Sequence, residues 1–262
     1  MSADRSAARF HLGLALIGGL YVALIVALLV ADLASISPAH LARALASREI
    51  RAALWLSLIS CSITAILSVW VGVPLGYLLA RVPFPGRGLV AFLLDVPIVL
   101  PPLVVGLSLL VLFQTPPGLA VQRLVPVTYH VPAVILAQFA VAAAFAARTM
   151  RVTFERTDPR AERVALTLGC SPAQAFWRVA LPEAWPGVMS AFTLAWARSL
   201  GEFGPVLIFA GTTRMKTEVL PTTVYLELSV GNVEAALAVS ALMIGVAAAV
   251  LVVSWTFGLR DS

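Results

Sequence analysis

The sequence predicts an all-α integral membrane protein with six transmembrane helices, and three observations carry this prediction. Hydrophobic residues make up 60% of the 262 residues and charged residues only 12%, which excludes an ordinary soluble domain. The apolar residues gather in six runs, most of them near the roughly 20 residues that cross about 30 Å of hydrocarbon as a helix. The runs are continuous rather than alternating, which disfavours a β-barrel.

In chain order, the predicted spans are 10–31, 54–80, 89–113, 131–147, 188–211 and 235–258. The fourth run is the shortest. The first follows Arg5 and Arg9, so a secretory signal peptide is the alternative to a retained span. Its apolar core is longer than a usual signal core, which favours the span. We expect the whole chain, 1–262, to form a single transmembrane domain.

Basic residues predict the orientation, because they are enriched in cytoplasmic loops. With the N-terminus inside, eleven arginines lie on the inner side: Arg5, Arg9, Arg81, Arg87, Arg148, Arg151, Arg156, Arg160, Arg163, Arg178 and Arg260. Six basic residues lie outside: Arg43, Arg48, Arg51, Arg123, Arg214 and Lys216. Both termini and the segment 157–182 are therefore expected in the cytoplasm. The net charge of +5 reflects this topology and indicates no nucleic-acid partner.

The polar, arginine-rich segment 157–182 is predicted to form two short helices joined by a glycine turn. Asp158-Pro159 and Ser171-Pro172 are helix starts, because Asp and Ser cap free N–H groups and Pro fits the first turn. Gly169 suits the left-handed residue that ends a helix, and Leu181-Pro182 is expected to end the second element. Such helices, about 13 Å long, are too short to span. They either press into a soluble partner or lie on lipid headgroups.

The third predicted span contains Pro97, Pro101 and Pro102. Proline removes a helix hydrogen bond and kinks the axis, and membranes tolerate this where neighbours or a water-lined cavity satisfy the freed carbonyls. The segment is thus either a broken helix beside a passage or a kink that merely packs.

In the fifth predicted span, Arg198 and Glu202 are four residues apart and face each other on a helix. An isolated charge at the bilayer centre costs roughly 2.5–3.5 kcal/mol, so the two either only neutralise each other or lie beside the passage. Gly201, Gly204 and Pro205 allow this helix to bend or pack closely.

The segment 157–182 resembles the cytoplasmic loop signature of permease subunits in ATP-binding-cassette (ABC) importers, written E-A-A-x3-G-x9-I-x-L-P. Aligned on Gly169, Val179 takes the Ile place and Leu181-Pro182 completes the match. The triplet Arg163-Val164-Ala165 departs at its first two positions, and Glu162 lies one residue earlier. The departure puts in doubt a contact that needs a carboxylate at position 163.

The resemblance covers roughly residues 54–250. The segments 95–113 and 195–211 resemble the third and fifth spans of permeases for molybdate, tungstate and sulfate. The motif GEFG in the second of these segments narrows the resemblance to this group of oxyanion permeases. The departure of the triplet 163–165 from the signature and the segment 220–232 favour a molybdate/tungstate permease over a sulfate permease.

The resemblance implies the ABC importer permease fold and its partners: two ATPase subunits, an extracytoplasmic substrate-binding protein, and a second copy of the chain in the cytoplasmic membrane. The residues implied at the ATPase contact are Glu162, Arg163, Ala165, Gly169, Phe176, Trp177, Leu181 and Pro182, with Leu166, Leu168, Phe176 and Trp177 presented to a groove. The passage or gate candidates are Pro101, Pro102, Arg198, Glu202 and Gly204. No catalytic residue, cofactor or metal site is implied.

Three other functions compete with this interpretation. A sulfate/thiosulfate importer is the near alternative. An ion-coupled secondary transporter needs a relay of intramembrane acids, and Glu202 is the one clear midspan acid in the sequence. An intramembrane enzyme needs a nucleophile–base pair or metal ligands, whereas His11, His40 and His130 are scattered. The chain has one lysine, Lys216, preceded by Met215 rather than the Gly of a P-loop, so ATP hydrolysis requires another subunit.

Overall fold

The computed structural model describes the backbone of residues 2–258 and the side chains of residues 10–252. Helices form nearly all of the described chain, and no strand occurs within it. The two chain ends and Arg260, which the basic-residue count places in the cytoplasm, lie outside the described residues.

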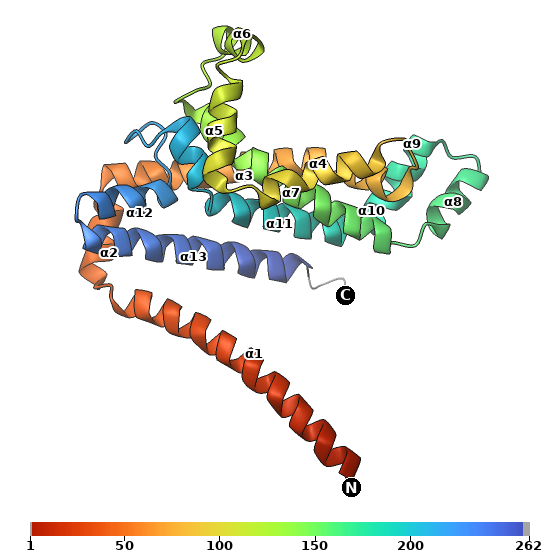
Figure 1. Ribbon diagram of the computed structural model, residues 1–262, viewed down its shortest axis with the longest axis horizontal. Helices are drawn as coiled ribbons and strands as arrows, with labels where there is room; N and C mark the ends of the chain where they lie inside the picture. Colours follow the sequence, from red (N-terminus) through yellow and green to blue (C-terminus); the bar gives the residue numbers. More distant parts are fainter. Residues whose placement is uncertain (1, 259–262) are drawn as a thin grey trace.

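The centre of the molecule is a bundle of long helices that run side by side in Figure 1: α3 (Arg48–Arg81), α7 (Val131–Arg156), α11 (Trp185–Leu200) and α13 (Val233–Gly258). α3 and α7 pack with their backbones in contact, because glycines of α3 face α7. A Cβ on Gly72 would lie 3.0 Å from Ala146, and one on Gly76 would lie 2.6 Å from the Cβ of Met150. Alanines line much of the buried face of α7, which permits this close approach.

α1 (Ser2–Ala34) leaves the bundle next to α2 (Pro38–Ala46) and diverges from it along its length (Figure 1). None of its apolar stretch, Phe10–Ala34, is buried within the chain. Ser37 caps α2 by accepting a hydrogen bond from the Ala39 N–H, and Ser47 caps α3 by accepting one from Ile50. These caps turn the chain sharply between α1, α2 and α3.

The prediction of six continuous spans is only partly met. Among the described residues, four helices are long and apolar enough to cross a membrane: Phe10–Ala34, Arg48–Arg81, Val131–Arg156 and Val233–Val252. They correspond to the first, second, fourth and sixth predicted spans. The fourth, expected to be the shortest, belongs to a 26-residue helix, because the polar residues after 147 continue it beyond the apolar run.

The third predicted span is broken. α4 (Arg87–Val99) and α5 (Pro102–Leu112) meet at an angle of 113°. Pro101 and Pro102 lie at the break, where they end one helix and start the next, as proline's missing N–H and fixed φ dictate.

The fifth predicted span is also not one continuous helix, which corrects the expectation from its apolar run. α11 has 16 residues, about 24 Å at 1.5 Å per residue, short of the hydrocarbon thickness. Gly201–Phe203 interrupts it, and the chain resumes as the π-helical turn η2 (Val206–Ala210). Gly201 and the Gly204-Pro205 pair favour a break here.

The remaining elements gather at the two ends of the bundle (Figure 1). α2 and α12 (Leu220–Ser229) lie at one end, and α8 (Arg160–Thr167), α9 (Pro172–Ala175) and α10 (Leu181–Glu183) lie at the other. α6 (Pro116–Leu124) stands apart beyond α5. Cys61 and Cys170 are both free.

Candidate functional site

The segment 157–182 folds as the two predicted short helices. The Asp158 side chain accepts a hydrogen bond from the Arg160 N–H at 3.0 Å, and α8 begins there. Gly169 ends it with φ of +90°, in the left-handed region that favours glycine. Ser171 and Gln174 then form a capping box at the start of α9. We call Asp158–Glu183, which protrudes from the end of the bundle in Figure 1, the lever.

The helix that starts at α9 does not end at Leu181-Pro182, which corrects the sequence prediction. It continues through the π-helical turn η1 (Phe176–Ala180) into α10, and the Leu181 N–H bonds to the Phe176 carbonyl. In an α-helix the Pro182 ring would clash with the carbonyl four residues earlier. The wider π turn removes that clash, so the helix passes the proline.

The lever has an outer and an inner face, and the predicted ATPase-contact residues divide between them. Arg163, Gly169, Trp177 and Pro182 are exposed, as are Leu166 and Leu168. Trp177 is 66% exposed and Leu168 80%. Ala165 is buried, and Glu162, Phe176 and Leu181 are half-buried against the bundle.

Phe176 therefore faces inward, contrary to the expectation that it is presented to a groove. Its ring lies edge-on to Tyr77 at 4.8 Å between centroids, and Tyr77 also meets Phe154 at 5.4 Å. These three aromatic rings hold the second half of the lever on α3 and α7.

Glu162 also points into the molecule. It accepts a hydrogen bond from the Tyr77 hydroxyl, and its second oxygen lies 3.8 Å from Nε of Arg81. Arg81 donates from its other end to the Thr157 carbonyl at 2.7 Å. Tyr77 and Arg81 lie near the C-terminal end of α3. The sequence analysis counted Arg81 only for the orientation and did not name Tyr77, because no local pattern links them to residues some 80 positions away.

The two broken spans meet at their breaks. A Cβ on Gly204 would lie 3.0 Å from Pro102, and one on Gly106 would lie 2.7 Å from the Cα of Pro205. The structure thus brings together Pro102 and Gly204, two of the predicted passage residues. Pro101 and Pro102 are exposed on the surface of the single chain.

Arg198 and Glu202, the other two passage candidates, form an ion pair at 2.5 Å. Glu202 is 1% exposed, whereas Arg198 is half-buried and lies over the ring of Phe145 at 5.9 Å from its centroid. The buried carboxylate thus has its counter-charge one helical turn away, as the spacing predicts.

Gln138 links the helices around this point. It accepts from Thr64 of α3 at 3.2 Å and donates to the Ser199 carbonyl of α11 at 3.3 Å. α3, α7 and α11 are therefore joined by a buried polar group next to the break in the fifth span.

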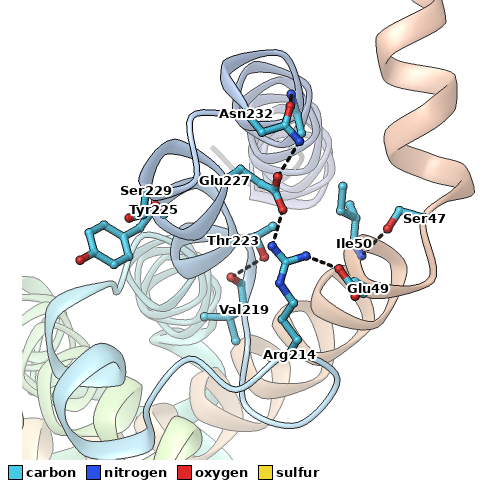
Figure 2. A network of polar contacts seen from close by, with 11 residues as sticks. Ser47, Glu49, Ile50, Arg214, Val219, Thr223, Tyr225, Glu227, Ser229 and Asn232 are labelled. Carbon is cyan, nitrogen blue, oxygen red and sulfur yellow. Dashed lines mark hydrogen bonds and ion pairs between the residues drawn. The ribbon is translucent and has the colours of Figure 1, made fainter.

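A second polar network lies at the opposite end of the molecule from the lever (Figure 2). Arg214, in the loop after η2, donates to Glu49 at the start of α3 and to Glu227 of α12, the latter at 2.8 Å. Asn232 donates to the other oxygen of Glu227 at 2.8 Å. No local sequence pattern predicts this network, since its members come from three separate segments.

A cavity of about 500 Å³ adjoins this network. His40, Arg43 and Glu234 line it beside Arg214, Glu49 and Glu227. Within it, Glu234 lies 3.1 Å from the His40 ring and 3.7 Å from Arg43, so acids and bases are paired around its wall.

Comparison with known proteins identifies the family. Residues 72–259 match the family described as "Binding-protein-dependent transport system inner membrane component". The chain belongs to this family. Family members are inner-membrane components of transport systems, so the apolar helices are membrane spans, and the chain is a transport subunit rather than an enzyme.

Curated relatives of this binding-protein-dependent transport component are permeases. The chain is 40% identical over 154 residues to the molybdate/tungstate transport system permease protein WtpB of Pyrococcus abyssi, covering 59% of this chain and 58% of that protein. It is 34% identical over 222 residues to a probable molybdenum ABC transporter permease protein of Haloferax volcanii, covering 85% and 81%. It is 33% identical over 233 residues to the sulfate permease CysT of Escherichia coli, covering 86% and 84%.

Solved structures support the same fold. A chain of a bacterial ABC transporter involved in import of the acidic polysaccharide alginate superposes with a TM-score of 0.72 at 18% identity, covering 93% of this component and 90% of that chain. A chain of an alginate ABC transporter in complex with a periplasmic protein gives 0.71 at 15% identity, covering 94% of both. The expected ABC transporter permease fold is thereby confirmed.

Proposed function

We propose that this chain is the membrane-spanning permease of an ATP-driven importer that moves a tetrahedral oxyanion, molybdate or tungstate, across the cytoplasmic membrane. The observation that carries the substrate assignment is the identity of 34–40% to the Haloferax and Pyrococcus permeases named for molybdenum, molybdate and tungstate. The chain itself belongs to the family of inner-membrane transport components.

The lever is the contact for an ATPase subunit, so that two copies of the permease bind two ATPase subunits. Its exposed face combines Leu168 and Trp177 with Arg163 and Arg178, and aromatic and arginine anchors dominate the energy of such interfaces. Closure of the ATPase pair pushes the lever and moves the packed helices as rigid bodies. The whole chain acts as one transmembrane domain in this step.

A second copy of the chain completes the passage around a two-fold axis. The break at Pro101-Pro102 is exposed in the single chain, which supports its placement on the passage or on the second copy. Arg198 neutralises Glu202 next to the Gly204 break, and a substrate-binding protein docks at the end that carries α2 and α12.

The lever end is cytoplasmic in this proposal, and so are both termini. The start of α1 and the end of α13 point towards the lever end in Figure 1, which supports placing them on one side. The basic residues counted on the inner side agree with this orientation.

The sulfate permease of Escherichia coli, 33% identical over 86% of the chain, makes sulfate the second candidate. Uptake of labelled molybdate by cells carrying this importer decides between them. We expect unlabelled tungstate to compete and sulfate at the same concentration not to compete. Equal competition by sulfate would assign the importer to sulfate.

A further inference from the structure

Glu162 is the one acidic residue of α8, and its carboxylate is used inside the chain. It accepts a hydrogen bond from Tyr77 and pairs with Arg81 at 3.8 Å. The side chains of Glu162 and Arg81 are only 13% and 15% exposed. A group held in this way has little of its surface left for another subunit.

The same contacts fix the hinge of the lever. Arg81 reaches from Glu162 to the carbonyl of Thr157, 2.7 Å away, where α7 ends. One guanidinium therefore ties together the end of α7, the first helix of the lever and the end of α3. Charge-assisted hydrogen bonds of this kind are the stronger ones in proteins.

Tyr77 and Arg81, which hold Glu162, belong to α3, whose backbone packs directly against that of α7. Tyr77 follows Gly76, where a Cβ would come within 2.6 Å of Met150 on α7. Because the α3 and α7 backbones are in contact, a force applied to the end of α3 also moves α7.

We propose that Glu162 is a positioning residue that braces the lever against α3 through Tyr77 and Arg81, so that displacement of the lever is transmitted to the α3–α7 pair. This inference rests on the proposed function of the lever. Without the brace, α8 keeps only its flanking backbone and its packing on α9 and η1 within the lever, and the ATPase moves α8 without moving the spans.

The test uses the complete importer with its ATPase subunits, reconstituted in lipid vesicles, and measures molybdate transported per ATP hydrolysed. Three variants remove the brace: Glu162→Ala, Tyr77→Phe and the double variant. Tyr77→Phe keeps the aromatic ring that contacts Phe154 and Phe176 and deletes only the hydroxyl. We expect each to lower the transport ratio by roughly 3- to 10-fold, with the double variant no worse than the singles, as for residues that share one interaction.

Two further variants are matched controls. Glu162→Gln keeps an oxygen that accepts from Tyr77 and should restore much of the ratio. Glu155→Ala removes a nearby acid that pairs with Arg151 at 2.8 Å on the surface of α7 and should leave the ratio unchanged.

Several outcomes would overturn the brace. One is an unchanged transport ratio in Glu162→Ala and Tyr77→Phe. Another is a double variant whose loss equals the sum of the two single losses. A third is failure of Glu162→Ala to retain the ATPase subunits, which would place Glu162 in the subunit contact. A wild-type complex that shows no ATP-dependent uptake would instead contradict the proposed function itself.

Discussion

Gly204 lies against Pro102 where the two broken spans meet: a β-carbon at position 204 would be 3.0 Å from the Cβ of Pro102 and 3.0 Å from the backbone nitrogen of Leu103. The neighbours on both sides are backbone or ring atoms, which give way poorly. The contact holds the interrupted fifth span on the start of α5, so the two breaks move together.

Adding a methyl group at this contact should impair both stability and transport. We expect Gly204→Ala to destabilise the protein by about 1–3 kcal/mol, the usual effect of overpacking, and to slow uptake. Gly201→Ala is the matched control, because its new Cβ would meet nothing closer than 3.9 Å. Thermal unfolding in detergent and vesicle uptake measure both effects. Identical behaviour of the two variants would show that the breaks are not in close contact.

The ion pair of Arg198 and Glu202 gives a prediction for a double variant. Arg198→Gln leaves a buried carboxylate without its counter-charge, and breaking a buried pair in this way typically costs about 3–5 kcal/mol. The double variant Arg198→Gln, Glu202→Gln should recover most of the thermal stability and of the uptake, because a neutral amide then replaces the unpaired buried carboxylate. A double variant that is stable but slow in uptake would assign Arg198 to the path of the anion.

Neighbouring residues of the lever should respond in opposite ways. Trp177→Asp should abolish binding of the ATPase subunits and leave the melting temperature unchanged, since the indole is 66% exposed. Phe176→Ala should lower the melting temperature by several degrees, because it removes a ring that packs on Tyr77 and large-to-small core changes cost about 3–5 kcal/mol when fully buried. Co-purification and thermal unfolding of both variants test this contrast. If both variants still bound the ATPase subunits, the lever would not be the subunit contact.

The loop between η2 and α12 contains a carboxyl group whose titration should affect stability. Glu218 is 2% exposed, and within the described residues neither of its carboxylate oxygens has a hydrogen-bond partner. Burial raises its pKa above the usual 4.5, and the Thr223 hydroxyl and Arg214 oppose the shift, while Glu49 and Glu227 add to it. The Thr223 hydroxyl donates to the Val219 carbonyl at 3.1 Å, so it is engaged elsewhere.

Because the folded protein then binds the Glu218 proton more tightly than the unfolded chain, its contribution to stability is present below pH 4.5 and is lost as pH rises through the raised pKa. Glu218→Gln mimics the protonated group and should escape this loss. The melting temperature of the variant should exceed that of the wild type by an amount that grows as the pH rises above the ordinary pKa of 4.5. Glu234→Gln, an exposed acid at the same end, is the control. A pH-independent difference would mean that Glu218 does not titrate in this range.

The elements that the sequence predicted correctly depend on local rules. Apolar runs give the long spans, Ser171-Pro172 gives the start of α9, and Gly169 gives the left-handed turn, because each effect acts within a few residues. The pairing of Arg198 with Glu202 was predicted from their spacing of four residues, although Glu202 lies in the break that follows α11. The loop signature around Gly169 and Pro182 predicted the family, and the family match of residues 72–259 confirms this prediction.

The errors arise where tertiary contacts override local signals. The fifth predicted span is interrupted at Gly201–Phe203 although its apolar run predicts one helix. The helix passes Pro182 because a π turn accommodates the ring. The inward direction of Glu162 and Phe176 depends on Tyr77 of a distant helix, and the Arg214 network joins three segments. Hydrophobic periodicity carries no information on such pairings.

The central claim is that the lever meets an ATPase subunit through its exposed face, and a photo-cross-linking residue at position 177 tests it most directly. In the complete importer in lipid vesicles, illumination should link this position to the ATPase subunit, and the yield should change when ATP binds. The same residue placed at position 176, on the inner face, should link within the chain. A label at 177 that reacts only with lipid, with the ATPase subunits present, would contradict the account.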